Sequence, residues 1–349
     1  MISGLLDLFQ AGLFDSLMEN LWLALVFFAI GVLLLIKGGD WFVDSAVNLA
    51  KRFRVPEIII GATVVSIGTT LPEVMVSATA AVGGNGAIAY GNAIGSIICN
   101  TSLIAAITVA VRPGPVDRKT ISMPVLFYFV SAAIYMMAAY VFGRFDRWLG
   151  VVMLAVFGLY MFMTIRAGFK NPVAQEHHEE ASQEAEGSLF KDILVLIGSA
   201  LLIAVGAEFL EGSAVSLAEN HLGIPTEVVG VTVVALCTSL PELVTAITSL
   251  IKGHGSLSLG NIIGANIFNL VLVSGVSVTI APFAVPAGSQ LMGISASKLV
   301  EIPLMVGVMA LLTLPTLFCK RLRRWQGLVL LGIYVAFVVL QVLMALGAV

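Results

Sequence analysis

The sequence predicts an all-α polytopic membrane protein with ten transmembrane helices, built as two inverted-topology repeats of five, with broken helices 2 and 7. Three observations lead to this prediction. The chain of 349 residues is 59% hydrophobic and only 11% charged, with a mean hydropathy of +1.03, whereas a soluble domain carries about 25% charged residues. Its apolar segments reach the length of about 20 residues that crosses a bilayer. Its two halves also repeat one unusual motif.

The ten predicted spans follow from the length of the apolar segments. They lie near residues 21–51, 56–82, 87–110, 121–142, 149–167, 191–219, 226–251, 256–282, 299–318 and 327–348. The predicted parts are an amphipathic N-terminal segment at 1–20, a first repeat at 21–168, a linker at 169–190 and a second, inverted repeat at 191–349. The linker divides the spans five and five, and it is too short and too acidic to fold as a domain.

The lysines and arginines of the loops predict the orientation, because these residues concentrate on the cytoplasmic side. With the N-terminus outside, fourteen of them face one side: Lys51, Arg52, Arg54, Arg112, Arg118, Lys119, Arg166, Lys170, Lys191, Lys252, Lys320, Arg321, Arg323 and Arg324. Only Arg144, Arg147 and Lys298 face the other side. We therefore expect both termini outside and the linker in the cytoplasm, in a protein of the cell (inner) membrane.

One motif occurs in both halves. Residues 61–73, GATVVSIGTTLPE, recur as GVTVVALCTSLPE at 230–242, an offset of 169. The same offset relates GNAIGSIICN at 91–100 to GNIIGANIFN at 260–269. Because each half holds an odd number of spans, the second copy must cross the membrane upside down. Inverted repeats with interrupted helices are typical of secondary transporters, whose ion sites lie near the bilayer midplane at the repeat interface.

In each copy of the motif a glutamate follows a proline. Proline has no N–H, so the carbonyl four residues earlier loses its helical partner. Freed carbonyls, hydroxyls and carboxylates form a set of hard oxygen ligands, which calcium prefers. The residues alone give as candidate ligands Thr69, Thr70, Glu73, Thr238, Ser239, Glu242 and the carbonyls near Ala235 and Thr238. No histidine or cysteine joins the cluster beyond the nearby Cys237, which counts against zinc or copper.

Two carboxylates inside a bilayer are costly, at about 2.5 kcal/mol each even on insertion scales. Without a cation, one or both would be protonated. The site is therefore stable when it holds a divalent cation, several monovalent cations or protons. A single site that cannot cross the membrane empty exchanges ions and does not leak them.

Other polar residues of the spans are open to more than one interpretation. Ser96 and Asn100 are four residues apart, so both face one way, and we expect them to face the broken helices. Asn92 and Asn261 either cap or bond between helices or bind an ion directly.

Four acidic residues lie near the ends of spans one and six. Asp40, Asp44, Glu208 and Glu211 either line ion entrances or are paired or solvated at the interface. Lys37 is expected to pair with one of these acids or to extend its ammonium to the membrane surface.

On these motifs, the chain resembles the sodium/calcium exchanger family of the cation/calcium exchanger superfamily, in particular the compact bacterial calcium/sodium antiporters. The resemblance covers nearly the whole chain and rests on GTTLPE and CTSLPE together with GNAIGS and GNIIGA. It implies antiparallel repeats, and spans one and six that slide against a rigid core. It also implies that Glu73 and Glu242 bind calcium, with backbone carbonyls from Thr69 and Thr238.

The resemblance further implies two sodium sites. The inner site would use the Ser66 carbonyl, Thr69, Ser96, Ser239 and Glu73, and the outer site Thr70, the Ala235 and Thr238 carbonyls and Glu242. The chain departs from the pattern at Ala265, where structurally described microbial members have serine, and at Asn269, where they can have aspartate. Asn100 and Asn269 then form a neutral pair, and the outer sodium site is weaker.

The predicted function is secondary active antiport that exports Ca²⁺ in exchange for Na⁺ by alternating access, with both ions as transported substrates and no organic cofactor. Ca²⁺/H⁺ exchange is the nearest alternative, and a cation channel is the alternative from another class. No enzymatic activity is expected. The expected partners are the lipid bilayer and small cations, without nucleic acid. One chain completes the site, so a monomer is sufficient for transport.

Overall fold

The computed structural model describes residues 20–169, 188–222, 235–286, 290–291 and 293–346. Within these residues, nine helices are long and apolar enough to cross a membrane, and a shorter apolar helix spans Leu240–Ile251. These helices confirm the predicted all-α membrane fold. The N-terminal segment predicted at 1–20 lies outside the described residues except for Asn20, and so does the linker from 170 to 187.

The first half of the chain contains five spans. Their elements, with η for π-helical segments, are α3 (Leu21–Phe53), α4 (Glu57–Ile60), η1 (Gly61–Val65), α5 (Ser66–Val82), α6 (Gly86–Cys99), η2 (Asn100–Ala105), α7 (Ala106–Val111), α8 (Arg118–Met136), η3 (Met137–Phe142) and α9 (Arg147–Phe169). Each span begins and ends within three residues of its predicted position. Phe169 is still helical, so the helix extends one residue into the predicted linker.

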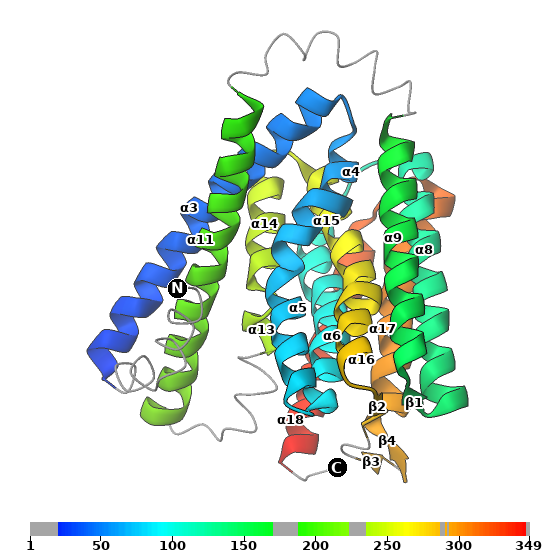
Figure 1. Cartoon of the computed structure of the whole chain (residues 1–349). Helices are drawn as coiled ribbons and strands as arrows, with labels where there is room; N and C mark the ends of the chain where they lie inside the picture. The colour runs from blue at the N-terminus through cyan, green and yellow to red at the C-terminus, as the bar shows by residue number, and fades with distance from the viewer. Residues whose placement is uncertain (1–19, 170–187, 223–234, 287–289, 292, 347–349) are drawn as a thin grey trace.

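The second half repeats this order in its described residues. Its elements are α11 (Leu189–Ser216), η4 (Leu217–His221), α13 (Ala235–Cys237), α14 (Leu240–Ile251), α15 (Gly255–Phe268), η6 (Asn269–Val273), α16 (Ser274–Ile280), η7 (Ser297–Glu301), α17 (Ile302–Cys319) and α18 (Arg324–Ala345). Two short antiparallel pairs lie at the lower end of Figure 1: β1 (Arg144–Phe145) with β2 (Phe283–Ala284), and β3 (Gln290–Leu291) with β4 (Ile294–Ser295). The seventh predicted span, 226–251, is described only from residue 235.

The two longest helices, α3 and α11, lie antiparallel beside each other at one side of the molecule (Figure 1). Glycines allow this close contact. A Cβ atom on Gly31 would lie 2.8 Å from the Gly206 carbonyl oxygen, and one on Gly206 would lie 2.9 Å from Leu34 Cβ. Small residues let helix backbones approach in a membrane, where the hydrophobic effect does not drive helices together. The pair therefore forms a two-helix unit that packs against the remaining spans.

The remaining spans form a bundle around α15, which is buried along most of its length. The contact of α15 with the second span is again glycine-mediated. A Cβ atom on Gly61 would lie 2.4 Å from the Leu257 carbonyl oxygen, and one on Gly260 would lie 2.2 Å from that of Ile58. The helix from one repeat thus lies directly against the motif of the other repeat.

The two motif copies differ from the expectation of two broken helices. The seventh span is interrupted, because α13 ends at Cys237 and α14 begins at Leu240. The second span instead runs through α4, η1 and α5 as one helix, with Pro72 inside α5. The irregular part of this helix is the π-helical segment η1, where two backbone carbonyls accept hydrogen bonds from side chains. Ser66 Oγ donates to the Gly61 oxygen at 2.8 Å, and Tyr160 Oη donates to the Ala62 oxygen at 3.0 Å.

Candidate functional site

Two buried carboxylates lie where the motif copies meet. Glu73 is inside α5 and Glu242 is in the first turn of α14, and the two residues are 1% and 0% exposed. Neither carboxylate oxygen of Glu73, nor Oε2 of Glu242, has a hydrogen-bond partner in the described part of the chain. A buried charge without a partner is strongly unfavourable. These oxygens therefore require a bound cation or a proton.

A hydrogen bond joins the two copies at this point. Thr70 Oγ1, on α5, donates to Glu242 Oε1, on α14, at 3.4 Å. Helices of opposite repeats thus contact each other through residues of the same motif. The structure brings together two half-motifs that are 169 residues apart in the sequence.

Further polar atoms without partners belong to the third, seventh and eighth spans. They are Ser96 Oγ, Ser239 Oγ and the side-chain amides of Asn100 and Asn269, all in residues at most 2% exposed and without partners among the described residues. Four buried polar side chains left unpaired in this way are unusual in a folded protein. Together with the carboxylates they supply oxygen atoms that a cation can coordinate.

The two asparagines of this set begin equivalent π-helical segments. Asn100 is the first residue of η2 and Asn269 the first residue of η6. A π-helical turn widens the helix locally and changes the direction of the side chains that follow, and such segments are frequent at functional sites. The apolar pattern of the sequence predicts a span here but carries no signal for the wider turn.

Asn261 holds the hydroxyls of the first motif copy in place. Its Oδ1 accepts hydrogen bonds from Ser66 Oγ at 3.2 Å and from Thr69 Oγ1 at 3.3 Å, and Ser66 Oγ also lies 3.0 Å from the Asn261 carbonyl oxygen. Its counterpart Asn92 donates through Nδ2 to the Glu73 carbonyl oxygen at 3.1 Å and to Ser77 Oγ at 2.8 Å. Of the interpretations left open, the structure favours bonding between helices for both asparagines.

The second motif copy is described only in part. Ala235 is the first residue of α13, and Thr238 lies in the turn between α13 and α14. Their carbonyls are the atoms that the resemblance implies as ligands. The turn at Thr238 and Ser239 interrupts the helix between α13 and α14, and interrupted helices are typical of the ion sites of secondary transporters.

One buried contact near the site was not predicted from the sequence. Asn266 Nδ2 donates to Thr101 Oγ1 at 2.7 Å, and both residues are 0% exposed. This bond ties the third and eighth spans together next to Asn100 and one turn before Asn269. The repeat could not reveal it, because the positions equivalent to Asn266 and Thr101 are Ile97 and Leu270, which are apolar.

The arrangement fits a hard cation better than a soft one. Its unpartnered atoms include carboxylate, hydroxyl and amide oxygens, which are typical ligands of calcium. Among the described residues, no group of three or more histidine, cysteine, aspartate or glutamate side chains could hold a metal. A site of two carboxylates and neutral oxygens has the charge to balance one divalent ion.

The four acidic residues near the ends of spans one and six fall into two groups. Asp40 and Asp44 are paired, with Lys252 Nζ at 3.5 Å and 2.8 Å from their Oδ1 atoms, and Lys37 forms no ion pair within the described residues. Glu208 and Glu211 lie on α11 on either side of Leu210, whose backbone packs against Gly31 of α3.

Comparison with known proteins agrees with these features. The family described as "Sodium/calcium exchanger protein" matches residues 23–166 and 191–343. The sodium/calcium exchanger MaX1 of Methanosarcina acetivorans is 32% identical over 347 residues, covering 89% of this chain and 96% of the relative. The inner membrane protein YrbG of Escherichia coli is 33% identical over 269 residues, covering 74% and 81%.

A solved structure agrees with the fold. The structure of the sodium-calcium exchanger NCX_Mj soaked with Na⁺ and Sr²⁺ superposes with a TM-score of 0.76 at 30% identity, covering 91% of this chain and 98% of that chain. The fold and these matches define the class as a multi-pass cation/calcium exchanger of the membrane. The chain belongs to the sodium/calcium exchanger family.

Proposed function

We propose that the protein is a secondary active antiporter that exports Ca²⁺ in exchange for Na⁺ by alternating access. The observation that carries this proposal is the buried pair Glu73 and Glu242, whose oxygens are largely unpartnered and whose helices are joined by the Thr70 hydrogen bond. Two carboxylates balance one Ca²⁺, two Na⁺ or two protons. Each state in which the site moves across the membrane is therefore filled.

The remaining ligands are assigned from the positions of this sequence that match the motifs of the family. Calcium is held by both glutamates and by the carbonyls of Thr69 and Thr238. The inner sodium site uses Ser66, Thr69, Ser96, Ser239 and Glu73, and the outer site uses Thr70, Ala235, Thr238 and Glu242. Asn100 and Asn269, buried and unpartnered in the described structure, complete the set as neutral oxygen donors.

The orientation follows from the basic loops, with both termini outside and the upper end of Figure 1 in the cytoplasm. We assign the protein to the cell (inner) membrane, as the name of YrbG indicates for that relative. One chain supplies both half-sites, so a monomer suffices.

A second candidate function is Ca²⁺/H⁺ exchange. The observation that favours it is the neutral side of the site: Ala265 and Asn269 are both 0% exposed, and neither side chain carries a charge. Compared with family members that have serine at the position of Ala265, the eighth span here supplies one hydroxyl fewer. Sodium therefore has fewer ligands, and the two carboxylates bind protons more readily relative to sodium. A cation channel is less well supported, because the site is enclosed within one chain.

Transport in proteoliposomes tests both candidates. A Na⁺ gradient is expected to drive ⁴⁵Ca²⁺ movement, and Glu73→Gln or Glu242→Gln is expected to reduce it by about 30-fold or more, since each removes one of two charges from a buried site. Glu301→Gln is the matched control, because Glu301 lies in a span but pairs with Gln341. Flux driven by a pH gradient and indifferent to Na⁺ would establish proton exchange. Flux without any counter-ion would establish a channel.

A further inference from the structure

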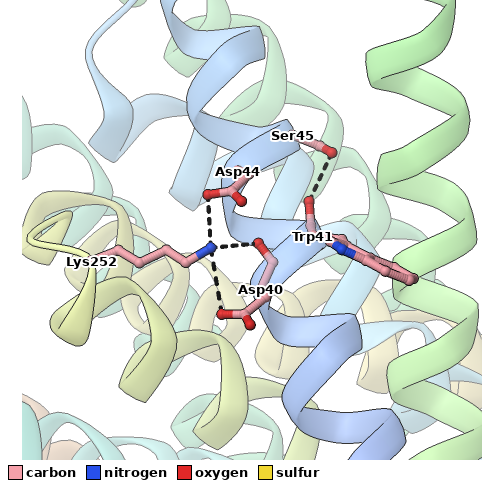
Figure 2. A network of polar contacts seen from close by, with 5 residues as sticks. All are labelled: Asp40, Trp41, Asp44, Ser45 and Lys252. Atoms are coloured by element: carbon pink, nitrogen blue, oxygen red, sulfur yellow. Dashed lines mark hydrogen bonds and ion pairs between the residues drawn. The ribbon is translucent and has the colours of Figure 1, made fainter.

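Lys252 connects the two-helix unit to the bundle. It follows α14, and Figure 2 shows its ammonium among three oxygens of α3. Nζ lies 2.9 Å from the Asp40 carbonyl oxygen, 2.8 Å from Asp44 Oδ1 and 3.5 Å from Asp40 Oδ1. Asp40 and Asp44 are one helical turn apart, so a single ammonium reaches both. The contact therefore fixes the position of α3 along α14.

The same stretch of α3 packs against the first copy of the motif. Phe42, between the two aspartates, is 1% exposed. Its ring contacts Gly68, where a Cβ atom would lie 3.1 Å from Phe42 Cζ. Gly68 comes directly before Thr69, and its carbonyl is the one that Pro72 leaves without a helical donor. A shift of α3 by one helical turn, about 5.4 Å, would remove Phe42 from Gly68 and from the backbone next to Thr69.

A close backbone contact lies beside the ion pair. Gly39 faces α14, where a Cβ atom would lie 2.6 Å from Val244 Cγ1, 3.0 Å from Thr248 Oγ1 and 3.9 Å from Thr248 Cβ. With Val244 in place, no larger residue fits between the helices there. The helices α3 and α14 are thus in direct contact at the end of the molecule where Lys252 lies.

The other half of the protein has no such lysine. The residue equivalent to Lys252 is Gly83, and the residue equivalent to Asp44 is Gly212, in the register that relates SAVNLA at 45–50 to SAVSLA at 213–218. The lysine contact between α3 and α14 thus has no equivalent lysine at the matching position of the other repeat. An asymmetric connection favours one of two otherwise related conformations.

We propose that Lys252 is a positioning residue that holds α3 over the glutamate pair, and that its contact with Asp40 and Asp44 breaks each time the ion site opens toward the Lys252 end. The proposal rests on the exchange function given above. Lys252 touches no ion ligand. It sets how often the site faces each side of the membrane, and hence the apparent ion affinity on each side.

The expected effect of removing the Lys252 charge follows from the solvent exposure of the three charged side chains. The side chain of Lys252 is 25% exposed, and those of Asp40 and Asp44 are 40% and 59% exposed. Ion pairs with this much solvent contact contribute little each. For Lys252→Met, which keeps the aliphatic stem and removes the charge, we expect a shift of about threefold to tenfold in the balance of the two conformations.

A cross-link measures the contact without transport. Cysteines at Gly39 and Thr248 would have Cβ atoms 3.9 Å apart, which suits a disulfide. The pair is introduced with Val244→Ala, which makes room, and in a chain whose Cys99, Cys237 and Cys319 are replaced by alanine. We expect Lys252→Met to slow disulfide formation by about threefold to tenfold. Lys119→Met is the control, because the Lys119 side chain is exposed away from this contact.

Transport supplies the second measurement. In vesicles of known orientation, Lys252→Met is expected to lower the half-saturating Ca²⁺ concentration on the Lys252 side and raise it on the other side. The exchanged pair Lys252→Asp with Asp44→Lys is expected to restore the balance. A residue with only a structural role would change the amount of folded protein and leave the ratio of the two sides unaltered.

The outcomes separate this proposal from the proposed function. Equal cross-linking rates with and without the Lys252→Met substitution would overturn the role of Lys252, even if calcium exchange is normal. Slower cross-linking in a protein that shows no ion-driven calcium flux would support the contact and reject the exchange function. Slower cross-linking with an unchanged ratio of affinities would also overturn the proposal, since the contact would then not control access.

Discussion

The two copies of the repeated motif are close in sequence but different in backbone. GATVVSIGTTLPE lies in one continuous helix that includes a π-helical segment, and Pro72 is inside that helix. In CTSLPE the helix stops at Cys237 and restarts at Leu240, so Pro241 lies in the first turn of a new helix. The sequence repeat places the same kinds of side chain at equivalent positions of the two copies. The backbone that carries these side chains nevertheless differs between the copies.

The difference makes the two glutamates unequal. Glu242 is in the first turn of α14, where the helix dipole favours negative charge, and its Oε1 accepts a hydrogen bond from Thr70. Glu73 is in the middle of a helix, and neither of its oxygens has a partner among the described residues. In the proposed ion site, the charge of Glu73 would therefore depend more on a bound cation than the charge of Glu242 would.

The largest expected effect comes from the contact that holds the first copy against α15. In Gly260→Ala the new Cβ atom would lie 2.2 Å from the Ile58 carbonyl oxygen and 2.9 Å from Ile58 Cα. Because these are backbone atoms of a packed helix, they cannot move aside cheaply. We expect a loss of about 3 kcal/mol in stability, at the upper end for overpacking, seen as a lower unfolding temperature in detergent.

Gly307→Ala provides the matched control for this substitution. Gly307 is in α17, and a Cβ atom there would meet no described atom within 4 Å. Alanine also has the better helix propensity. Stability should therefore be unchanged or slightly higher. Equal losses for Gly260→Ala and Gly307→Ala would contradict the close contact between the repeats.

The second expected effect separates the two prolines. Pro72→Ala supplies an N–H that can bond the Gly68 carbonyl, so the helix becomes more regular and more stable, and the neighbouring Thr69 carbonyl, a proposed ligand, becomes less accessible to an ion. We expect calcium exchange to fall by about tenfold, because one hydrogen bond to a charged or ion-binding group contributes roughly 1.5 kcal/mol. Flux in proteoliposomes and unfolding temperature measure the two changes.

Pro241→Ala should have little effect on either quantity. Pro241 is in the first turn of α14, where its missing N–H has no intrahelical acceptor and proline is well tolerated. We expect less than about a twofold change in flux, within the few tenths of a kcal/mol of substitutions that remove no specific interaction. If both prolines proved equally sensitive, the two copies would work alike despite their different backbones.

Much of this fold could be predicted because membrane spans depend on apolar length alone. The end of α5 and the start of α6 lie within about one residue of their predicted positions. The burial of the two glutamates could be predicted too, because each follows a proline inside an apolar segment, where a carboxylate is too costly to face lipid. The repeat then supplied the partner of each glutamate.

The parts that could not be predicted depend on tertiary contacts. The π-helical segments at Asn100 and Asn269 have no periodic signature, and the continuous second helix depends on donors such as Tyr160, which is far away in the chain. The sequence offers Lys37 as a partner for one of the four acids near the ends of spans one and six, or as a side chain that extends to the membrane surface, but it does not indicate that the crossing of α3 over α14 brings Lys252 to Asp40 and Asp44. These features follow from how the helices cross.

The smallest expected effect concerns a hydroxyl that only the first copy has. Ser66 corresponds to Ala235 in the second copy, so Ser66→Ala makes the two copies alike at this position. It removes the bonds from Ser66 Oγ to Gly61 and to Asn261. We expect a loss of about 1 kcal/mol in stability, with exchange largely kept, because the backbone carbonyl of residue 66 remains.

Ser277→Ala is the control, since the Ser277 hydroxyl bonds within its own helix, to the Val273 carbonyl. It should cost less than Ser66→Ala. A double-mutant cycle of Ser66→Ala with Asn261→Ala should show coupling of about 0.5 kcal/mol or more, as residues that share a hydrogen bond do. Additive losses would mean that Asn261 does not hold the first copy in place through Ser66.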